Sequence, residues 1–113
     1  MQFDIYTGND ELTVPTISIG GKGVISVASN VVPRIMHNMC KLALSGNIHE
    51  AGREQLSLLK LIDVLFSEVN PIPVKTAMNI MGLCSDEMRL PLCQLSADKK
   101  TALKSCLREY KII

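Results

Sequence analysis

Two short strand-like runs stand near the start of the chain, and each is followed by a polar loop and a helical pattern. The first run is Phe3–Tyr6, which leads into Thr7-Gly8-Asn9-Asp10. The second run is Val24–Val27, which follows the glycine-rich segment Gly20-Gly21-Lys22-Gly23. Short runs rich in β-branched or aromatic residues and flanked by turn residues predict strands. The chain therefore opens with two successive strand–loop–helix units.

Apolar residues recur every three or four positions over the rest of the chain, which predicts helices. Polar residues suited to helix N-caps precede most of these patterns. The candidate caps are Asn9 or Asp10, Ser29 or Asn30, Asn47 and Ser96. Glycine or proline separates the helices, at Gly20, Gly46, Asn70-Pro71 and Gly82, with a short helix expected over Val74–Met81. The predicted order is strand, helix, strand, helix and then three helices.

This order favours part of a larger α/β fold. Two strands alone leave both sheet edges unpaired, and a sheet that small is only marginally stable. Val24–Val27 is apolar on both faces, which is typical of a parallel strand covered on both sides. The chain is mostly helical, and we expect residues 1–46 to form the last two β/α units of a (β/α)8 barrel and residues 47–113 a helical C-terminal extension.

The composition bears mainly on which kinds of partner, such as another protein segment, nucleic acid or a membrane, the chain is expected to bind. The chain is 47% hydrophobic with two Phe, two Tyr and no Trp, so its apolar surface is aliphatic and suited to helix packing. Such a surplus in 113 residues implies a face that meets another segment or subunit. A net charge of +1 argues against nucleic acid, and no apolar stretch approaches the roughly 20 residues that span a membrane.

The cysteines favour a reducing compartment. Cys40, Cys84, Cys93 and Cys106 are irregularly spaced and form no Cys-x-x-Cys pair, and no signal-peptide pattern stands at the start. We therefore expect buried, reduced thiols and a cytoplasmic location. His37 and Cys40 share a predicted helix, but no third ligand has suitable spacing, so neither a metal nor a cofactor is expected.

The glycine-rich segment is expected to be structural. A phosphate-binding loop follows a strand and opens a helix, whereas Gly20-Gly21-Lys22-Gly23 precedes its strand. The segment therefore predicts a helix stop and a tight turn. Lys22 lies at the N-terminal end of that strand and Lys75 in the first turn of a helix, so neither has the buried, strand-borne setting of a nucleophilic lysine. The strand ends Gly8-Asn9-Asp10 and Ala28-Ser29-Asn30 lie where barrel enzymes place substrate contacts.

Several segments, taken in order, resemble the C-terminal part of the dihydrodipicolinate synthase family. The glycine-flanked strand is shared with related pyruvate aldolases, and the Asn-Pro-Ile-Pro-Val-Lys run is more particular to the synthase. The segments are Tyr6-Thr7-Gly8-Asn9-Asp10, Gly20-Gly21-Lys22-Gly23-Val24-Ile25-Ser26-Val27, Asn30, Asn70-Pro71-Ile72-Pro73-Val74-Lys75 and Arg89-Leu90-Pro91-Leu92. Together they span essentially the whole chain.

The resemblance implies a pyruvate-dependent lyase of lysine biosynthesis that condenses pyruvate with aspartate semialdehyde. It also implies a (β/α)8 barrel with C-terminal helices and, usually, a tetramer. In that family a barrel lysine forms a Schiff base with pyruvate, helped by a tyrosine and a threonine. The resemblance places all three residues in the part of the family upstream of this chain, so nothing here matches them. Tyr6 and Tyr110 lie in the wrong segments to replace the tyrosine. The chain alone is therefore expected to be inactive.

Two substrate-binding residues carry over by resemblance. Ile25 aligns with the isoleucine whose carbonyl faces bound pyruvate, and Gly8 with a glycine that lines the pocket, where a positive φ is expected. Asn9 stands where the family more often has Asp. We expect a homo-oligomer, or a partner that supplies the missing upstream segment. The alternatives are a self-associating helical assembly module and one half of a split enzyme.

Overall fold

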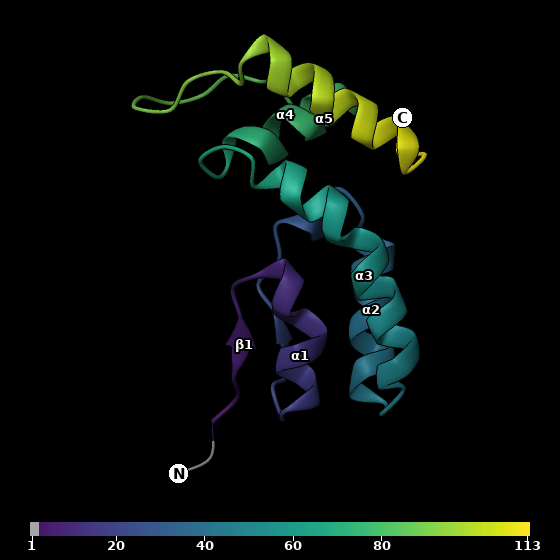
Figure 1. Cartoon of the computed structure of the whole chain (residues 1–113). Coiled ribbons are helices and arrows are strands. Elements are labelled where there is room, and N and C mark those ends of the chain that lie inside the picture. The colour runs from purple at the N-terminus through teal and green to yellow at the C-terminus, as the bar shows by residue number, and fades with distance from the viewer. Residues whose placement is uncertain (1–2) are drawn as a thin grey trace. The chain divides into compact units, whose positions relative to one another are not determined.

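The computed structural model describes residues 3–113 and contains five α-helices, two short strands and two 3-10 turns over that range (Figure 1). The elements are β1 (Tyr6–Thr7), η1 (Asp10–Leu12), α1 (Thr13–Ser18), β2 (Gly23–Val24), η2 (Ala28–Asn30), α2 (Pro33–Leu44), α3 (Ile48–Leu65), α4 (Ile72–Ile80) and α5 (Ala97–Glu109). Their order confirms the predicted one. The chain divides into two compact units, residues 1–59 and 60–113, and the division falls within α3.

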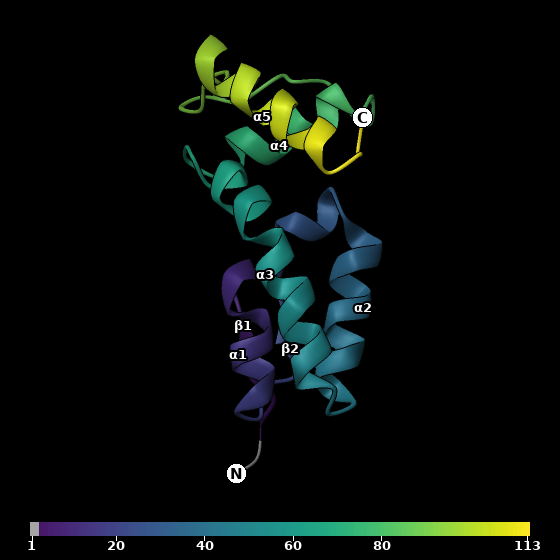
Figure 2. The same cartoon turned by 45° about the vertical axis from the view of Figure 1, so that its right-hand side comes forward.

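The two strands are parallel and shorter than predicted (Figure 2). Tyr6 pairs with Gly23 and Thr7 with Val24. The expected bounds Phe3–Tyr6 and Val24–Val27 are therefore wrong. On the first strand, residues 3–5 are exposed and only the Ile5 carbonyl still accepts a bond, from the Lys22 N–H at 2.8 Å. The second strand ends early because the N–H groups of Val27 and Ala28 donate to the Asp10 side chain instead of to the first strand.

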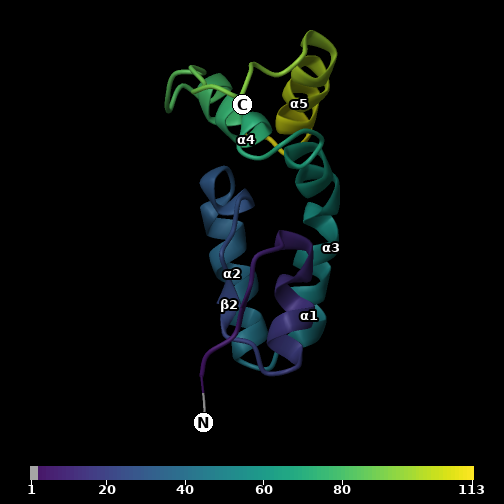
Figure 3. The same cartoon turned by 90° about the vertical axis from the view of Figure 1, so that its left-hand side faces the viewer.

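Helix α1 holds the first unit together, because it contacts both strands and α2 (Figure 3). The helical periodicity predicted here is confirmed in α2, since Met36, Met39 and Ala43 are buried and Arg34 and Lys41 are exposed. Apolar side chains that this unit buries come from α1, from η2 and the residues after it, from α2 and from the first turns of α3: Val14, Ile17, Ala28, Val31, Val32, Met36, Met39, Ala43, Ala51 and Leu58. Around the strands, however, Phe3 is 71% and Ile25 72% exposed, so the sheet is not covered on both sides as expected.

The glycine-rich segment is a helix stop and a tight turn, as predicted. Gly20 has φ +106°, in the left-handed region that favours glycine. Gly21 has no room for a side chain, because a Cβ there would lie 2.5 Å from the Thr16 Cγ2 and 2.7 Å from the Thr16 carbonyl oxygen. The Gly21 N–H donates to that same oxygen at 2.8 Å. The close approach of α1 and β2 therefore depends on these two glycines.

Helices α4 and α5 contact each other in the second unit, where the last turns of α3 also bury leucines. The buried set includes Leu61, Leu65, Ala77, Leu103, Cys106 and Leu107, and the last three lie at helical spacing on one face of α5. The apolar periodicity predicts that Phe66 is buried, but Phe66 lies just beyond the end of α3 and is 42% exposed. Helix α4 begins at Ile72 rather than Val74, since proline is tolerated in a first helical turn.

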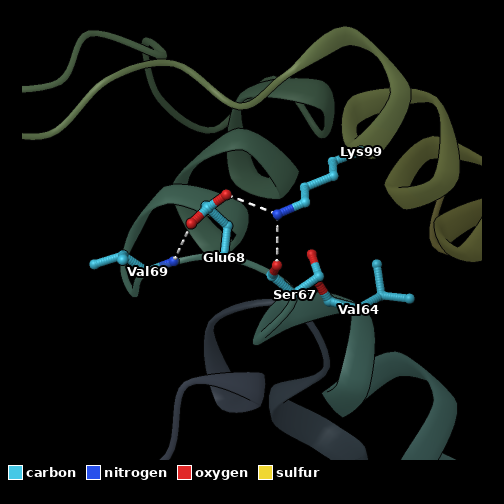
Figure 4. Close-up of polar contacts among 5 residues, drawn as sticks. All are labelled: Val64, Ser67, Glu68, Val69 and Lys99. Atoms are coloured by element: carbon cyan, nitrogen blue, oxygen red, sulfur yellow. Dashed lines mark hydrogen bonds and ion pairs between the residues drawn. The ribbon is translucent and has the colours of Figure 1, made fainter.

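Lys99 of α5 ties that helix to the turn after α3 (Figure 4). Its Nζ donates to the Ser67 carbonyl at 2.8 Å and to the Glu68 carboxylate at 2.7 Å. Two hydrogen bonds hold the pKa of the Glu68 carboxyl below its usual range. The bond from Lys99 has the larger effect and the bond from the Val69 N–H the smaller. The pair therefore stabilises the folded chain at pH values above the pKa that Glu68 has in the unfolded chain. This stabilisation is lost as the pH falls through the lower pKa that Glu68 has in the folded chain.

The predicted helix caps are mostly not used as caps. Asn9 and Ser96 do occupy N-cap positions, but neither side chain makes a capping hydrogen bond. Helix α2 starts after Val32, while the Asn30 side chain donates to the Val27 carbonyl at 3.0 Å. Over residues 3–113, no helix is long and apolar enough to cross a membrane.

Two Gly→Ala substitutions in the first unit should have opposite effects on stability. Gly21→Ala should lower the free energy of unfolding by about 1–3 kcal/mol, because the new methyl group overlaps Thr16. Gly52→Ala should raise it by about 0.5–1 kcal/mol, because Gly52 lies within α3 and a Cβ there meets nothing within 4 Å. Urea unfolding followed by circular dichroism, at one protein concentration, measures both. Equal effects would show that the turn at Thr16 opens without cost.

Candidate functional site

The structure brings Gly8 and Ile25 to the same edge of the sheet. Thr7 and Val24 are paired, so the residue after each lies at the carboxyl end of its strand. The Ile25 N–H donates to the Thr7 carbonyl at 2.8 Å, which extends the ladder by one bond. Carboxyl ends of parallel barrel strands are where substrates bind. This edge is therefore the candidate functional site.

The carbonyl of Ile25 is left open at this edge. If the parallel ladder continued, the Asn9 N–H would donate to it. The Asn9 N–H instead donates to the Thr7 Oγ1 at 3.1 Å. Within residues 3–113, no hydrogen bond to the Ile25 carbonyl is formed, and the residue is 72% exposed. Its oxygen is thus a backbone acceptor available to a ligand.

Asp10 holds the loop that follows β2. Its side chain is fully buried, and its Oδ2 accepts hydrogen bonds from the N–H groups of Val27 and Ala28, both at 3.0 Å. Its Oδ1 accepts a hydrogen bond from the Ser26 hydroxyl. These bonds draw Val27 and Ala28 away from the strand ladder, which is why β2 ends early. Asp10 is therefore a link between strand ends and not the helix cap that was expected.

The backbone of Asp10 is fixed as well. Its carbonyl accepts from the Thr13 hydroxyl at 2.8 Å and from the Gln55 Nε2 at 3.1 Å. The Oε1 of Gln55 accepts from the Val14 N–H at 3.1 Å. Gln55 is 5% exposed, so α3 contributes a buried amide that braces this turn. Sequence reasoning missed Ser26 and Gln55, although Ser26 and Asp10 both follow parallel strands and so belong to one edge.

Gly8 differs from the expectation in its backbone. The glycines with positive φ are Gly20, Gly23, Gly46 and Gly82, and Gly8 is not among them. A Cβ built on Gly8 would meet nothing within 4 Å. The predicted positive φ is therefore wrong, and this chain's own packing does not require glycine at position 8. Any need for glycine there must come from something outside the described residues.

The two lysines lie where the sequence placed them. Lys22 is exposed and immediately precedes β2, at the opposite end from Ile25. Lys75 lies in the first turn of α4, and its Nζ donates to the Glu87 carbonyl. The geometry gives neither lysine the buried strand position that Schiff-base chemistry needs.

A shallow depression of about 280 Å³ lies between the loop after β2 and α2. Its polar lining comes from Ser26, Ser29, His37 and Cys40. Burial raises the pKa of the Cys40 thiol, and the nearby Asp10 carboxylate raises it further. Over residues 3–113, no group of three or more His, Cys, Asp or Glu side chains could hold a metal ion.

The cysteines only partly match the expectation. All four are free thiols, but only Cys106 is buried. Cys40 and Cys84 are half-buried, and Cys93 is exposed in the segment before α5. The expected burial of all four is therefore wrong. Cys93 is exposed although Leu95, in the same irregular segment, is buried.

Comparison with known proteins identifies the class. A family model described as the dihydrodipicolinate synthetase family matches residues 1–110. The 4-hydroxy-tetrahydrodipicolinate synthase of Clostridium novyi (strain NT) is 48% identical over 109 residues, which are 96% of this chain and 37% of that enzyme.

Solved structures agree with this match. The dihydrodipicolinate synthase of Aquifex aeolicus has a TM-score of 0.96 at 43% identity, over 97% of this chain and 38% of that one. A chloride-inhibited dihydrodipicolinate synthase of Acinetobacter baumannii, complexed with pyruvate, has a TM-score of 0.94 at 34% identity, over 98% of this chain and 38% of that one.

The fold is therefore that of one part of a (β/α)8-barrel enzyme, because the enzymes that the chain matches are much longer. The chain belongs to the dihydrodipicolinate synthetase family and corresponds to a C-terminal portion of its members. It spans 37% of the length of the Clostridium enzyme and 38% of the Aquifex structure. The predicted family and fold class are confirmed.

Cysteine alkylation should follow exposure and thiol pKa. At neutral pH, Cys93 should react with iodoacetamide at least roughly tenfold faster than Cys106, because burial shields Cys106 and raises the pKa of its thiol. Labelling of Cys40 should increase steeply as the pH is raised, since its pKa is also raised. Peptide mass spectrometry resolves the sites, and the urea-unfolded chain, in which all four should react alike, is the control. Equal rates in the folded chain would contradict the packing of α5.

Proposed function

We propose that this chain contributes the C-terminal part of a 4-hydroxy-tetrahydrodipicolinate synthase, which condenses pyruvate with aspartate semialdehyde in lysine biosynthesis. Residues 1–46 supply the last two β/α units of the barrel, and residues 47–113 the helical extension. The observation that carries this proposal is the open Ile25 carbonyl at the carboxyl edge of β2, in a chain 48% identical to such a synthase. It provides part of the active-site mouth through backbone groups.

The Ile25 carbonyl is proposed to face bound pyruvate, and Gly8 to line the same pocket. A carbonyl oxygen carries partial negative charge, so it favours the electropositive centre of a protonated Schiff base. The Acinetobacter relative was solved with pyruvate, which supports pyruvate as the ligand of this class of enzyme. Gly8 follows Thr7 on the neighbouring strand, and its lack of a side chain leaves space beside Ile25.

The lysine that forms the Schiff base must come from another part of the barrel. Lys22 lies at the opposite end of β2 from Ile25, and Lys75 is bonded to the Glu87 carbonyl. We therefore propose that the chain acts with the upstream part of the barrel, in a cytoplasmic homo-oligomer. Exposed apolar side chains beside the strands, such as Phe3, Ile5 and Ile25, support a covering partner.

The isolated chain should not form a Schiff base with pyruvate. Incubation with pyruvate and borohydride should leave every lysine unmodified by intact-mass analysis, because no lysine among residues 3–113 lies on a strand. A full-length synthase treated alongside is the positive control. A stoichiometric adduct on Lys22 or Lys75 would overturn the proposed division of the chemistry.

Supplying the upstream part of the barrel as a separate chain should restore lyase activity. In this complemented enzyme, Ile25→Val should be nearly silent, since the carbonyl stays and a lost methylene group costs only about 1 kcal/mol. Gly8→Val should lower kcat/KM strongly, because its side chain would enter the space proposed for pyruvate. The isolated Gly8→Val chain should fold normally, since a Cβ there meets nothing within 4 Å.

The pair of variants tests the residue roles separately from the fold. Circular dichroism of the isolated variants controls for folding, and kcat/KM in the complemented enzyme measures function. If Gly8→Val is harmless while Ile25→Val abolishes activity, the proposed roles are wrong. If the unaltered chain restores no activity, the proposed function itself is wrong.

A further inference from the structure

Asp10 is the one fully buried charged side chain among residues 3–113, and the proposed chemistry does not use it. We propose that Asp10 is a positioning residue: by holding the loop after β2, it sets the direction of the Ile25 carbonyl toward the substrate. This inference rests on the proposed function for its substrate. Its structural part concerns this chain alone.

The peptide unit that carries the Ile25 carbonyl is held on both sides. On one side, the Ile25 N–H donates to the Thr7 carbonyl at 2.8 Å. On the other, the Ser26 hydroxyl donates to Asp10 and accepts from the Ser29 N–H at 2.8 Å. Because a peptide unit is planar, its carbonyl can turn only through ψ of Ile25 and φ of Ser26, and bonds on both flanking residues restrict that turn.

The Asp10 carboxylate also ends the hydrogen-bond ladder between the two strands at Ile25. Since its Oδ2 binds the Val27 and Ala28 N–H groups, the chain turns into η2 directly after Ser26. Ile25 is therefore the last residue bonded to β1. Without Asp10, the two N–H groups would lose their acceptor, and the loop would be free to rotate the Ile25–Ser26 peptide.

A carboxylate suits this position because it offers acceptors only. A buried charge is costly unless it is hydrogen-bonded, and here three donors from three consecutive residues meet it. Asparagine could replace it in part: its oxygen could accept from both N–H groups while its amide donates to the Ser26 oxygen. Alanine could replace none of these bonds. The two substitutions therefore separate hydrogen bonding from charge.

Amide hydrogen exchange on the whole chain tests the structural part. Asp10→Ala should raise exchange in peptides covering residues 26–30 roughly tenfold or more, while α2 and α5 stay protected. Asp10→Asn should remain within about threefold of the unaltered chain, because it keeps most of the bonds. Glu11→Ala is the matched control, since within residues 3–113 the exposed Glu11 carboxylate accepts a hydrogen bond from the Asn9 side chain alone, at 3.2 Å.

The outcomes decide the structural part in every case. Unchanged exchange at residues 26–30 in Asp10→Ala overturns it. If Asp10→Ala also loses protection in α2, the first unit has unfolded, and Ser26→Ala decides instead. That variant removes only the hydroxyl link, so faster exchange at residues 26–30 with α2 protected supports the proposal, and no change overturns it.

Kinetics in the complemented enzyme test the positioning. Asp10→Ala should raise the KM for pyruvate roughly tenfold with a smaller change in kcat, and Asp10→Asn should restore it to within about threefold. A purely structural role would reduce the amount of active complex, which lowers apparent kcat and leaves KM unchanged. That result would overturn the positioning role. If the unaltered chain restores no activity, both the proposed function and the role of Asp10 toward the substrate are wrong. The exchange data still decide whether Asp10 holds the loop.

Discussion

The buried carboxylate of Asp10 is the interaction on which the strand edge depends. It lies at the start of η1, after β1, yet its partners are Ser26, Val27 and Ala28, which follow β2. One side chain therefore ends β2, starts the turn into η2 and joins the two β/α units. Gln55 of α3 donates a hydrogen bond to the carbonyl of Asp10, so α3 is also anchored to this residue.

This arrangement explains how so small a sheet keeps a defined register. Two parallel strands share few hydrogen bonds, and such a sheet is marginal by itself. Here α1 packs on both strands, and glycine at positions 20 and 21 lets the chain return close to Thr16. The register is thus fixed by the turn before β2 and by the carboxylate after it, more than by the strands themselves. The apolar side chains left exposed around them fit a sheet that continues in a longer barrel.

The element order could be predicted from the sequence, because helix periodicity and glycine or proline stops are local signals. The buried faces of α2 and α5 followed from the same periodicity. Part of what failed was decided by distant contacts. The end of β2 and the role of Asp10 depend on bonds between residues about 16 or more positions apart, such as Asp10 with Ser26 and Gln55. The cap candidates Asn9 and Asn30 bond instead to residues two or three positions away, Glu11 and Val27. A capping residue and a cross-linking residue look the same in sequence, because both are short polar side chains at a helix start.

The candidate site shows why its residues are hard to recognise by chemistry. The groups at the edge are a carbonyl and a glycine, which any sequence motif search for nucleophiles, bases or metal ligands passes over. A backbone carbonyl has the same composition at every residue, so its function lies entirely in its direction and in its lack of an internal partner. In the proposed site, the neighbours that would set this direction are Thr7, Ser26 and Asp10, which bond to the Ile25 N–H or to one another. A residue that contacts a ligand only through its carbonyl is therefore free to vary in its side chain, whereas the residues that hold its backbone are not.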